Sequence, residues 1–282
     1  MPDLNGSVAV VTGAARGIGR ALSLGLLAAG ASLVAADRAW DGAEATRGEF
    51  EASGRALIVD FDLNDAAAVA DARDRAVARF GRIDILVNNA ALRMRALFMP
   101  AGLSTVLDAS DADWAAMDRV IVRGTLTVTR AFVPPMRAGG RGGSIIMIGS
   151  AGSLPVTHDG DGTWRAGRIA PRNQPYDAAK AALASLSFSL ADELRADGIA
   201  VNIVWPGGTM TTGSAEMRAA RIAAGVNTGA YLRPEHVVPS VLHLARQSGP
   251  QAQTATAIDA PLWNGRHGFG DRAACVADNA GG

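Results

Sequence analysis

The sequence predicts an α/β protein of one domain, residues 1–282, in which a doubly wound parallel sheet has helices on both faces. Two observations predict this fold. Short apolar runs alternate with helix-length segments, which is the order that joins parallel strands through crossover helices. The runs are rich in β-branched residues and lack polar alternation, as strands covered on both faces do. No linker, repeat or composition break divides the chain, so we expect a single domain.

Six apolar runs, bounded by Gly, Asp or Asn, are expected to form buried strands. They are residues 7–12, 32–36, 56–60, 83–87, 144–148 and 199–205. The segments between them have the length and periodicity of helices, and they are residues 17–29, 40–53, 65–80, 111–137, 175–196 and 234–247. Asp65 and Asp111 stand where a side-chain oxygen can cap a helix N-terminus.

Charge and cysteine content exclude several functional classes. The 27 basic and 27 acidic residues balance, which gives no support for a nucleic-acid or anionic-membrane partner. Cys275 is the single cysteine, so it excludes an intrachain disulfide and fits a reducing cytoplasm. Residues 1–5 lack a signal-peptide pattern, and no apolar run approaches the roughly 20 residues of a membrane helix. We therefore expect a cytoplasmic protein without membrane contacts.

Two loops are longer than the scaffold requires. Residues 93–110 follow the fourth strand, and residues 154–173 follow the fifth and are rich in Gly, Pro, Asp and Arg. Ligand contacts in α/β folds gather in the loops after the carboxyl ends of strands. We therefore expect both loops at the mouth of a ligand site. Residues 263–282 are expected to form a C-terminal tail.

A glycine-rich turn joins the first strand to the first helix. It reads TGAARGIG over Thr12–Gly19, with glycines at Gly13, Gly17 and Gly19. These glycines let the backbone turn sharply and approach a pyrophosphate, which the helix N-terminus attracts through its free N–H groups and its dipole. Because the turn follows the first strand and an acid ends the second, we predict a dinucleotide site at this edge of the sheet.

The acid at the end of the second strand is Asp37, 18 residues after Gly19. A carboxylate at this position can accept hydrogen bonds from the adenosine ribose hydroxyls, and it repels a 2′-phosphate. Arg16 and Arg38 complicate the assignment, since a guanidinium there can hold that phosphate. We weigh the carboxylate more heavily because it lies where the ribose must lie. NAD is therefore the expected cofactor, and NADP is the alternative.

One lysine stands out among the basic residues. Of the 27, 26 are arginine, and Lys180 lies four positions after Tyr176 on a predicted helix. Residues at this spacing share one helix face, and an ammonium beside a phenol favours the phenolate and lowers the phenol pKa. Tyr176 can then exchange a proton with a substrate oxygen as general acid/base. An ammonium is also a compact donor that reaches a phenol and ribose hydroxyls together, unlike the wide guanidinium fork.

Ser150 ends the fifth predicted strand and is the third candidate catalytic residue. Its hydroxyl can hydrogen-bond the substrate oxygen and share the developing charge with Tyr176. Ser153 is a competing candidate for the same task.

Several motifs resemble those of the short-chain dehydrogenase/reductase family, over about residues 5–262. They are Thr12–Gly19, Asp62-Leu63, Asn88-Asn89-Ala90-Ala91, Ser150, Tyr176-x-x-x-Lys180, and Asn202 followed by Pro206-Gly207. The resemblance implies a Rossmann-type sheet of about seven strands, with residues 254–259 as the last. It also implies that Asn88 lies along the cofactor and that the cofactor is bound by Gly13, Arg16, Gly17, Ile18, Gly19, Asp37, Arg38, Asp62, Leu63, Asn89, Ala90, Tyr176, Lys180, Pro206, Gly207, Thr209 and Thr211.

The sequence departs from the family pattern in ways that bear on the site. Ile121 takes the position of the family's catalytic asparagine, so a proton relay through that helix loses an amide. Ser150 and Tyr176 are 26 residues apart, about twice the family separation. The resulting insert contains His158 and Trp164, and we expect it to form a substrate wall or lid. In a third departure, alanine replaces glycine at the end of the Asn-Asn-Ala motif.

The sequence thus predicts an NAD(P)-dependent oxidoreductase that interconverts a secondary alcohol and a ketone. Its alternative is a dinucleotide-binding regulator or scaffold with little turnover, which Ile121 keeps open. The family resemblance implies a homo-oligomer, a tetramer or a dimer. The four histidines lack triad or metal-ligand spacing, so no metal site is expected.

Overall fold

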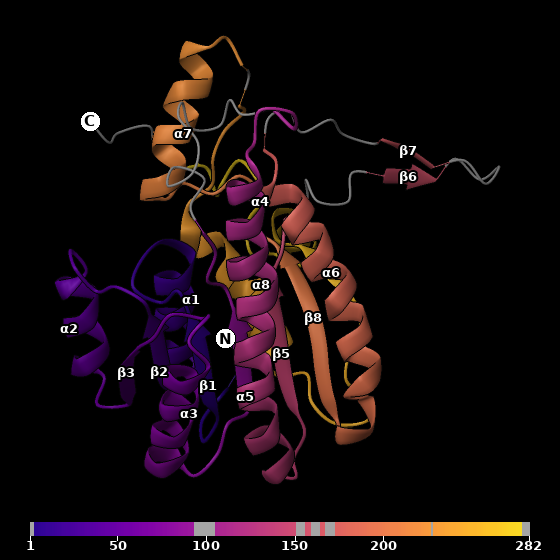
Figure 1. Cartoon of the computed structure of the whole chain (residues 1–282). Helices are drawn as coiled ribbons and strands as arrows, with labels where there is room; N and C mark the ends of the chain where they lie inside the picture. The colour runs from indigo at the N-terminus through magenta and orange to yellow at the C-terminus, as the bar shows by residue number, and fades with distance from the viewer. Residues whose placement is uncertain are drawn as a thin grey trace.

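Seven parallel strands form the central sheet, in the order β3-β2-β1-β4-β5-β8-β9 (Figure 1). The computed structural model describes residues 3–92, 105–150, 173–226 and 228–277, and the backbone of 156–158 and 164–166. The strands are β1 (Val8–Thr12), β2 (Ser32–Asp37), β3 (Ala56–Asp60), β4 (Ile85–Asn88), β5 (Gly143–Ile148), β8 (Ile199–Trp205) and β9 (Ala257–Asp259). The predicted doubly wound fold with seven strands is confirmed.

The strand order reverses at β1, which opens a crevice at the carboxyl ends of β1 and β4. Val10 of β1 pairs with Val34 of β2 on one side and with Leu86 of β4 on the other. Every residue of β1 is buried, because helices cover both faces of the sheet. Open α/β sheets bind ligands at such a switch point, so the fold directs a site to the region beyond Thr12 and Asn88.

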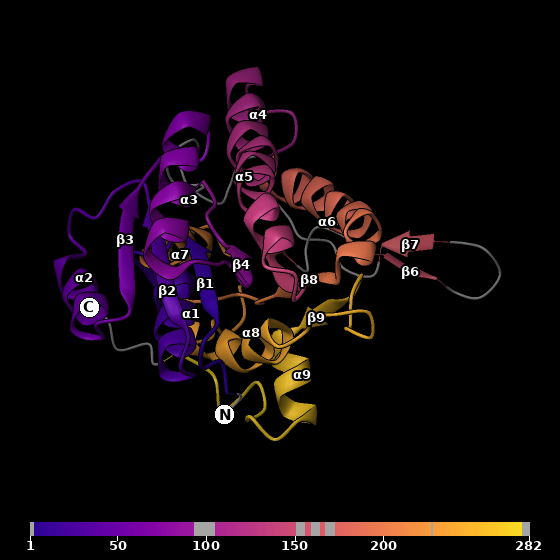
Figure 2. The same ribbon diagram turned by 90° about the horizontal axis from the view of Figure 1, so that it is seen from below.

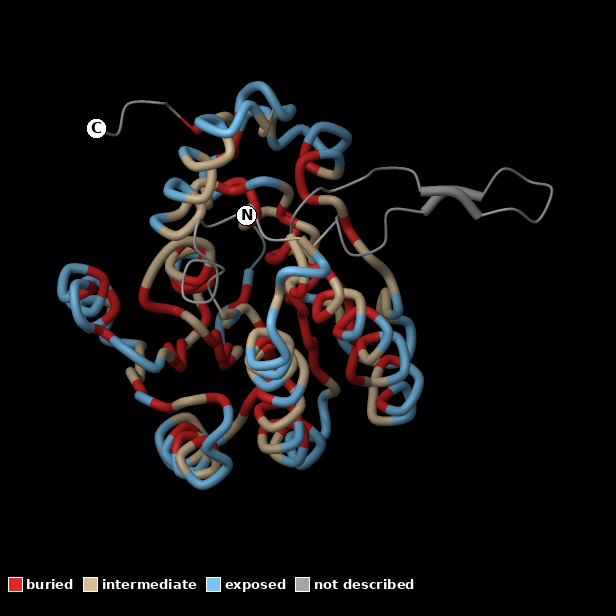
Figure 3. The backbone as a smooth tube through the Cα atoms, turned by 45° about the horizontal axis from the view of Figure 1, so that its top comes forward, coloured by how far each residue is buried: buried red, intermediate tan, exposed pale blue. Residues whose placement is uncertain are grey.

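The two faces of the sheet carry separate helix layers (Figure 2). One layer consists of α3 (Ala66–Phe80), α4 (Asp111–Met117), α5 (Thr125–Ala138) and α6 (Tyr176–Glu193). The other consists of α1 (Gly17–Ala28), α2 (Glu44–Ala52), α8 (Val238–Ala245) and α9 (Ala260–Arg266). Phe132 and Leu183 belong to the buried cluster of the first face, and Leu22 and Leu244 to that of the second. Figure 3 shows buried residues along the strands and on the inner sides of the helices.

Two helix starts test the capping predictions. Asp65 caps α3 as predicted, since its carboxylate accepts hydrogen bonds from two backbone N–H groups of the first turn. The prediction for Asp111 is wrong by one residue, because Ser110 is the N-cap of α4 and forms a capping box with Asp113. Serine followed three residues later by an acid satisfies two free donors at once. Asp111 therefore lies inside the first turn, where its charge is favourable to the helix dipole.

The segment predicted as one continuous helix over 111–137 contains a π-helical turn, Asp118–Gly124, between α4 and α5. Gly124 ends this turn, and a Cβ added there would lie 2.7 Å from the Cβ of Leu63. The wide turn and the glycine together let the helix pass close to the residue that follows β3. Such turns are frequent at functional sites, but apolar periodicity does not reveal a single widened turn.

Some elements were not predicted from the sequence. α7 (Thr212–Ala223) begins at Thr211, whose side chain forms a capping box with Ser214, and it lies above the carboxyl ends of the strands (Figure 1). The antiparallel pair of β6 (Val156–His158) and β7 (Trp164–Ala166) falls in the predicted insert and projects away from the sheet. α9 occupies the start of the predicted tail, so the tail is helical as far as residue 266.

Most of the 93–110 loop, residues 93–104, lies outside the described residues. None of the helices in the described part of the chain is long and apolar enough to cross a membrane.

Candidate functional site

The glycine turn between β1 and α1 has a shape that requires its glycines. Gly13 has a φ of +68° and Gly17 a φ of +55°, in the left-handed region that side chains disfavour. A Cβ added at Gly19 would lie 1.9 Å from the carbonyl oxygen of Gly13. The Asn89 side-chain amide donates to the carbonyl oxygens of Thr12, at 2.9 Å, and of Gly13, at 3.2 Å. The turn is thus tied to the end of β4.

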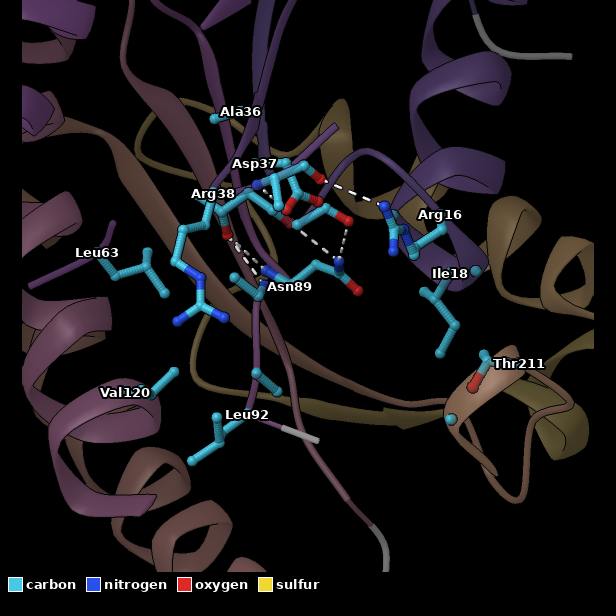
Figure 4. Close-up of a pocket in the computed structure, with 18 of the residues that line it drawn as sticks. Arg16, Ile18, Ala36, Asp37, Arg38, Leu63, Asn89, Leu92, Val120 and Thr211 are labelled. Atoms are coloured by element: carbon cyan, nitrogen blue, oxygen red, sulfur yellow. Dashed lines mark hydrogen bonds between the residues drawn. The ribbon is translucent and has the colours of Figure 1, made fainter. Parts of the chain in front are cut away.

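A cleft of about 460 Å³ lies beyond the carboxyl ends of β1, β2 and β4 (Figure 4). It brings together most of the predicted cofactor residues: Gly13, Arg16, Gly17, Ile18, Gly19, Asp37, Arg38, Asp62, Leu63, Asn89, Ala90 and Thr211. Its wall also contains Ala91 of the Asn-Asn-Ala-Ala motif and residues that were not predicted from the sequence: Ala36, Ala39, Phe61, Leu92, Val120, Thr212 and Gly213. Most of these are small or apolar, and only proximity in the fold identifies them.

Other predicted residues lie away from this wall. Pro206, Gly207 and Thr209 follow β8 and do not line the cleft, and neither do Tyr176 and Lys180 of α6. Asn88 is buried, and its amide donates to Thr129 Oγ1 at 3.2 Å. Asn88 therefore supports the end of β4 from inside the protein.

Bonds from the side chains of Asp37 and Arg16 join the glycine turn to the end of β2 and the segment that follows it. One carboxylate oxygen of Asp37 accepts from the Ala15 N–H at 3.0 Å, and the other accepts from the Ala39 N–H at 3.3 Å. A carboxylate has about four lone-pair sites, so two bonds leave acceptor capacity toward the cleft. The Arg16 guanidinium donates to the carbonyl oxygen of Asp41 at 2.7 Å. The Arg16 side chain points toward the end of β2, where Asp37 lies (Figure 4).

Asp62 and Arg38 lie where β3 and β2 end, next to Asp37. The Arg38 guanidinium is 3.7 Å from the Asp62 carboxylate. The pKa of Asp62 is lowered, mainly because the backbone N–H of Asn64 donates to it, with smaller contributions from the Asn64 amide and from Arg38. Asp62 is therefore ionised at neutral pH and can accept a hydrogen bond from an amine.

The far side of the cleft is formed by the N-terminus of α7. A Cβ added at Gly17 would lie 3.0 Å from the methyl carbon of Thr211. The cap of α7 is therefore packed against the glycine turn. This contact joins the first motif of the chain to the segment that follows Pro206-Gly207.

Lys180 lies inside the protein, 2% exposed, on α6. Its Nζ donates to the carbonyl oxygen of Ile148, the last residue of β5, at 2.6 Å. The same nitrogen lies 5.7 Å from the centre of the Tyr176 ring, as the i,i+4 spacing predicts. Burial lowers the pKa of Lys180 to about 8.

The pKa of Tyr176 is raised, first because burial disfavours the phenolate and second because the charge of Asp177 opposes it. The i,i+4 spacing predicts that Lys180 lowers this pKa, and the direction in the structure is the opposite. The physical reason is the loss of hydration together with the charge of Asp177, while the ammonium of Lys180 donates to Ile148. By itself the protein therefore holds Tyr176 as a neutral phenol at neutral pH.

Asp177 is a buried acid next to Tyr176 in the first turn of α6. It is 4% exposed, and its carboxylate accepts a hydrogen bond from the Asn173 amide at 2.8 Å. Burial raises the pKa of Asp177, while Asn173 and Arg221 of α7 act against that rise. An acid in the first turn of a helix is usually a solvated dipole partner, so no local signal marks this one as buried. The competing candidate Ser153 lies outside the described residues.

Ile121 lies in the π-helical turn with its side chain fully buried in the core. Its neighbour Val120 lines the cleft. His158 and Trp164 are register partners in the β6–β7 pair, and their side chains lie outside what the structure describes. The expected substrate wall or lid therefore stays a prediction.

Comparison with known proteins agrees with this arrangement. The family model described as short chain dehydrogenase matches residues 7–222. The chain is 43% identical over 275 residues to a fluoren-9-ol dehydrogenase of Terrabacter sp. (strain DBF63), which covers 96% of this chain and 75% of that protein. It is 32% identical over 246 residues to a 3-oxoacyl-(acyl-carrier-protein) reductase of Escherichia coli (strain K12), which covers 86% of this chain and 91% of that protein.

Solved structures show the same fold. A short chain dehydrogenase from Mycobacterium paratuberculosis, bound to NAD, matches with a TM-score of 0.75 at 29% identity, covering 91% of this chain and 97% of that one. The family model, the relatives and the glycine-turn geometry all agree. The chain therefore belongs to the short-chain dehydrogenase/reductase family of oxidoreductases.

Proposed function

We propose that the protein is an NAD-dependent dehydrogenase that interconverts a secondary alcohol and a ketone, with Tyr176 as general acid/base. The observation that carries the proposal is the buried ammonium of Lys180, which lies beside the Tyr176 ring and is bonded to Ile148. Burying a charge is costly, so a lone buried lysine at this spacing points to a chemical role. Ser150 follows two residues after Ile148, at the end of β5. The neighbouring strand β4 ends at Asn88, and Ala90, two residues later, lines the cleft.

The residues of the cleft fit NAD. Gly13, Gly17 and Gly19 form a cradle that any Cβ would fill, at the helix N-terminus where a pyrophosphate binds. The Asp37 carboxylate would accept from ribose hydroxyls and repel a 2′-phosphate. When bound, the nicotinamide accepts or returns the hydride, which no side chain can do. NADP remains the alternative because Arg16 lies beside the same turn.

The side chains would then move the proton and orient the substrate. In reduction the neutral phenol of Tyr176 donates to the ketone oxygen, and in oxidation its phenolate takes the alcohol proton. Its raised pKa means that reduction needs no prior deprotonation, whereas oxidation becomes faster as pH rises. The charge of Lys180 favours the phenolate when the site works in the oxidising direction. Ser150 orients the substrate oxygen through its hydroxyl.

We further propose that the substrate is a small molecule with a secondary alcohol on a rigid, largely apolar ring system. The support is the 43% identity with a fluoren-9-ol dehydrogenase, whose named substrate carries its hydroxyl on a secondary carbon between two aromatic rings. The preference for NAD favours oxidation of that alcohol as the working direction.

The test is turnover by the purified protein. Fluoren-9-ol with NAD, and the corresponding ketone with reduced cofactor, are followed at the absorbance band of reduced nicotinamide, with a 3-oxoacyl thioester as the comparison substrate. Turnover of the ring alcohol supports the proposal. NAD binding in calorimetry without turnover on a broad alcohol panel would instead support a dinucleotide-binding regulator or scaffold, which the replacement of asparagine by Ile121 favours.

A further inference from the structure

We propose that Trp205 is a specificity-determining residue whose indole ring forms a wall of the substrate site beside Ser150 and selects a planar aromatic alcohol over a saturated one. The inference deepens the proposed function and rests on it, because it concerns the ring system that carries the hydroxyl.

Trp205 stands at the edge of the sheet where ligands bind. It is the last residue of β8, and it is half-buried although every earlier residue of the strand is buried. The neighbouring strand β5 ends at Ile148, two residues before Ser150. Open α/β sheets bind ligands at the carboxyl ends of their strands. A large aromatic ring that stays partly open at this edge is therefore available to a bound substrate.

The indole packs against the backbone that leads into Ser150. The N–H of Gly149 donates to the carbonyl oxygen of Val204 at 2.9 Å, which places Gly149 beside the end of β8. A Cβ added at Gly149 would lie 3.0 Å from Cδ1 and 3.2 Å from Nε1 of Trp205. The pyrrole edge of the indole therefore rests on Gly149, one residue before the candidate catalytic serine.

Because the pyrrole edge is closed, the six-membered ring is the part of the Trp205 side chain left to face a ligand. Nε1 is buried, and it has no hydrogen-bond partner among the residues that the structure describes. A buried indole N–H usually has a partner, and a leucine or phenylalanine here would leave no donor unpaired. Tryptophan thus has a cost at this position that packing alone does not explain, which favours a ligand contact for the ring.

Trp205 lies on the same face of the sheet as the candidate general acid/base. Tyr176 of α6 and Met217 of α7 are also partly buried, and all three side chains pack against the core cluster of that face. α6 packs on β8, and α7 lies above the carboxyl ends of the strands (Figure 1). A ring system whose hydroxyl meets Tyr176 therefore has Trp205 on the same apolar side of the site.

Aromatic and saturated rings differ in what they gain from an indole. Both gain from the burial of apolar surface, but only an aromatic ring has the quadrupole that favours offset-stacked or edge-to-face contact with tryptophan. Such a contact corresponds to about a twofold to tenfold change in binding. Trp205 should therefore discriminate between two alcohols of similar size by the aromaticity of their rings.

Trp205→Leu and Trp205→Phe test the inference with fluoren-9-ol and its fully hydrogenated analogue as substrates. Leucine removes the aromatic ring, so we expect the ratio of kcat/KM for fluoren-9-ol to kcat/KM for the saturated alcohol to fall about fivefold. Phenylalanine keeps an aromatic ring and should retain most of the ratio. A purely structural role would lower both kcat/KM values alike and leave their ratio unchanged.

The matched control is Trp263→Leu, which removes a second half-buried indole. Trp263 lies on α9, in the helix layer on the other face of the sheet. Its replacement should therefore leave the ratio of the two kcat/KM values unchanged.

A double-mutant cycle of Gly149→Ala and Trp205→Leu, read by melting temperature, tests the contact without any turnover. A Cβ added at Gly149 would also lie 2.7 Å from Cγ2 of Ile203, but this clash is present with either residue at position 205. We expect Gly149→Ala to lower the melting temperature less when Trp205 is replaced, because the two residues share one contact.

The outcomes separate this inference from the proposed function. If fluoren-9-ol is turned over and Tyr176→Phe is inactive, but Trp205→Leu keeps the ratio or Trp205→Phe loses it as fully as leucine does, the inference is wrong and the proposed function stands. Additive melting-temperature shifts would overturn the inference in the same way. If the wild-type protein turns over neither alcohol, or if Tyr176→Phe remains active, the proposed function fails and the inference fails with it.

Discussion

The ammonium of Lys180 donates to the main-chain carbonyl of Ile148 at 2.6 Å. This bond joins α6, which carries Tyr176, to β5, which ends two residues before Ser150. One buried side chain therefore helps to set the distance between α6 and β5. An arginine could not take this place unchanged, because its planar fork is wider and needs more acceptors than a single carbonyl. The bond explains physically why one lysine persists in a chain whose other 26 basic residues are arginine.

Replacing Tyr176 by phenylalanine removes the proposed proton donor and keeps the ring. We expect kcat to fall by a factor of about 10²–10⁴, the usual contribution of general acid–base catalysis, while NAD affinity measured by calorimetry is retained. The control is Tyr231→Phe, which alters the other tyrosine of the chain, a buried ring against Arg218. Undiminished turnover by Tyr176→Phe would contradict the mechanism.

The buried Lys180 predicts a specific pH dependence of stability. Its pKa is about 8 in the folded protein against 10.5 ordinarily, so between these values the unfolded chain binds more protons. The free energy of unfolding should therefore rise with pH through this window, by about 3 kcal/mol in total. Below pH 8 both the folded and the unfolded chain hold the proton, so Lys180 adds no pH dependence there.

Lys180→Met removes the titrating group and should abolish that rise. Urea unfolding of both proteins at intervals between pH 8 and 10.5 measures the difference between their slopes. No other lysine is present to obscure it. If the free energy of unfolding changes with pH at the same slope in both proteins, the ammonium of Lys180 is hydrated, contrary to its 2% exposure.

Asp37→Ala should shift cofactor preference from NAD toward NADP. The change removes the acceptor for ribose hydroxyls and the charge that repels a 2′-phosphate, and it leaves Arg16 beside the turn. We expect the ratio of kcat/KM with NAD to kcat/KM with NADP to fall about tenfold or more, the effect of losing hydrogen bonds to a charged group. Adding Arg16→Ala should weaken NADP use in that variant. A constant ratio in Asp37→Ala would remove the proposed role of Asp37.

Ile121→Asn should destabilise the protein rather than restore a family feature. The Ile121 side chain is fully buried in the core, so an amide there loses water and apolar contacts together. We expect the free energy of unfolding to fall by about 2–4 kcal/mol in urea titration, without a rise in kcat. Ile121→Val, which removes one methyl group, should cost about 0.5–1.5 kcal/mol. Faster turnover by the asparagine variant would instead show that the amide reaches the site.

The sequence by itself determined the strands of the sheet and the positions of the candidate cofactor and catalytic residues. Strand residues such as Val10 and Leu86 are recognisable because burial on both faces requires continuous apolar runs. The glycine turn is equally recognisable, since a Cβ at Gly19 cannot coexist with the carbonyl of Gly13. The pairing of Tyr176 with Lys180 follows from helix periodicity. Each of these features depends on residues that are close together in the chain.

Only the tertiary structure decided what those groups contact. Lys180 meets Ile148 across 32 positions of the chain because α6 packs beside β5. The direction of the Tyr176 pKa likewise depends on burial and on a neighbouring charge, which no spacing expresses. The widened turn at Ile121 and the packing of Thr211 against Gly17 arise in the same way. Local patterns encode which side of an element is buried, whereas the partners of a buried polar group are set by packing between elements that the chain brings together only when folded.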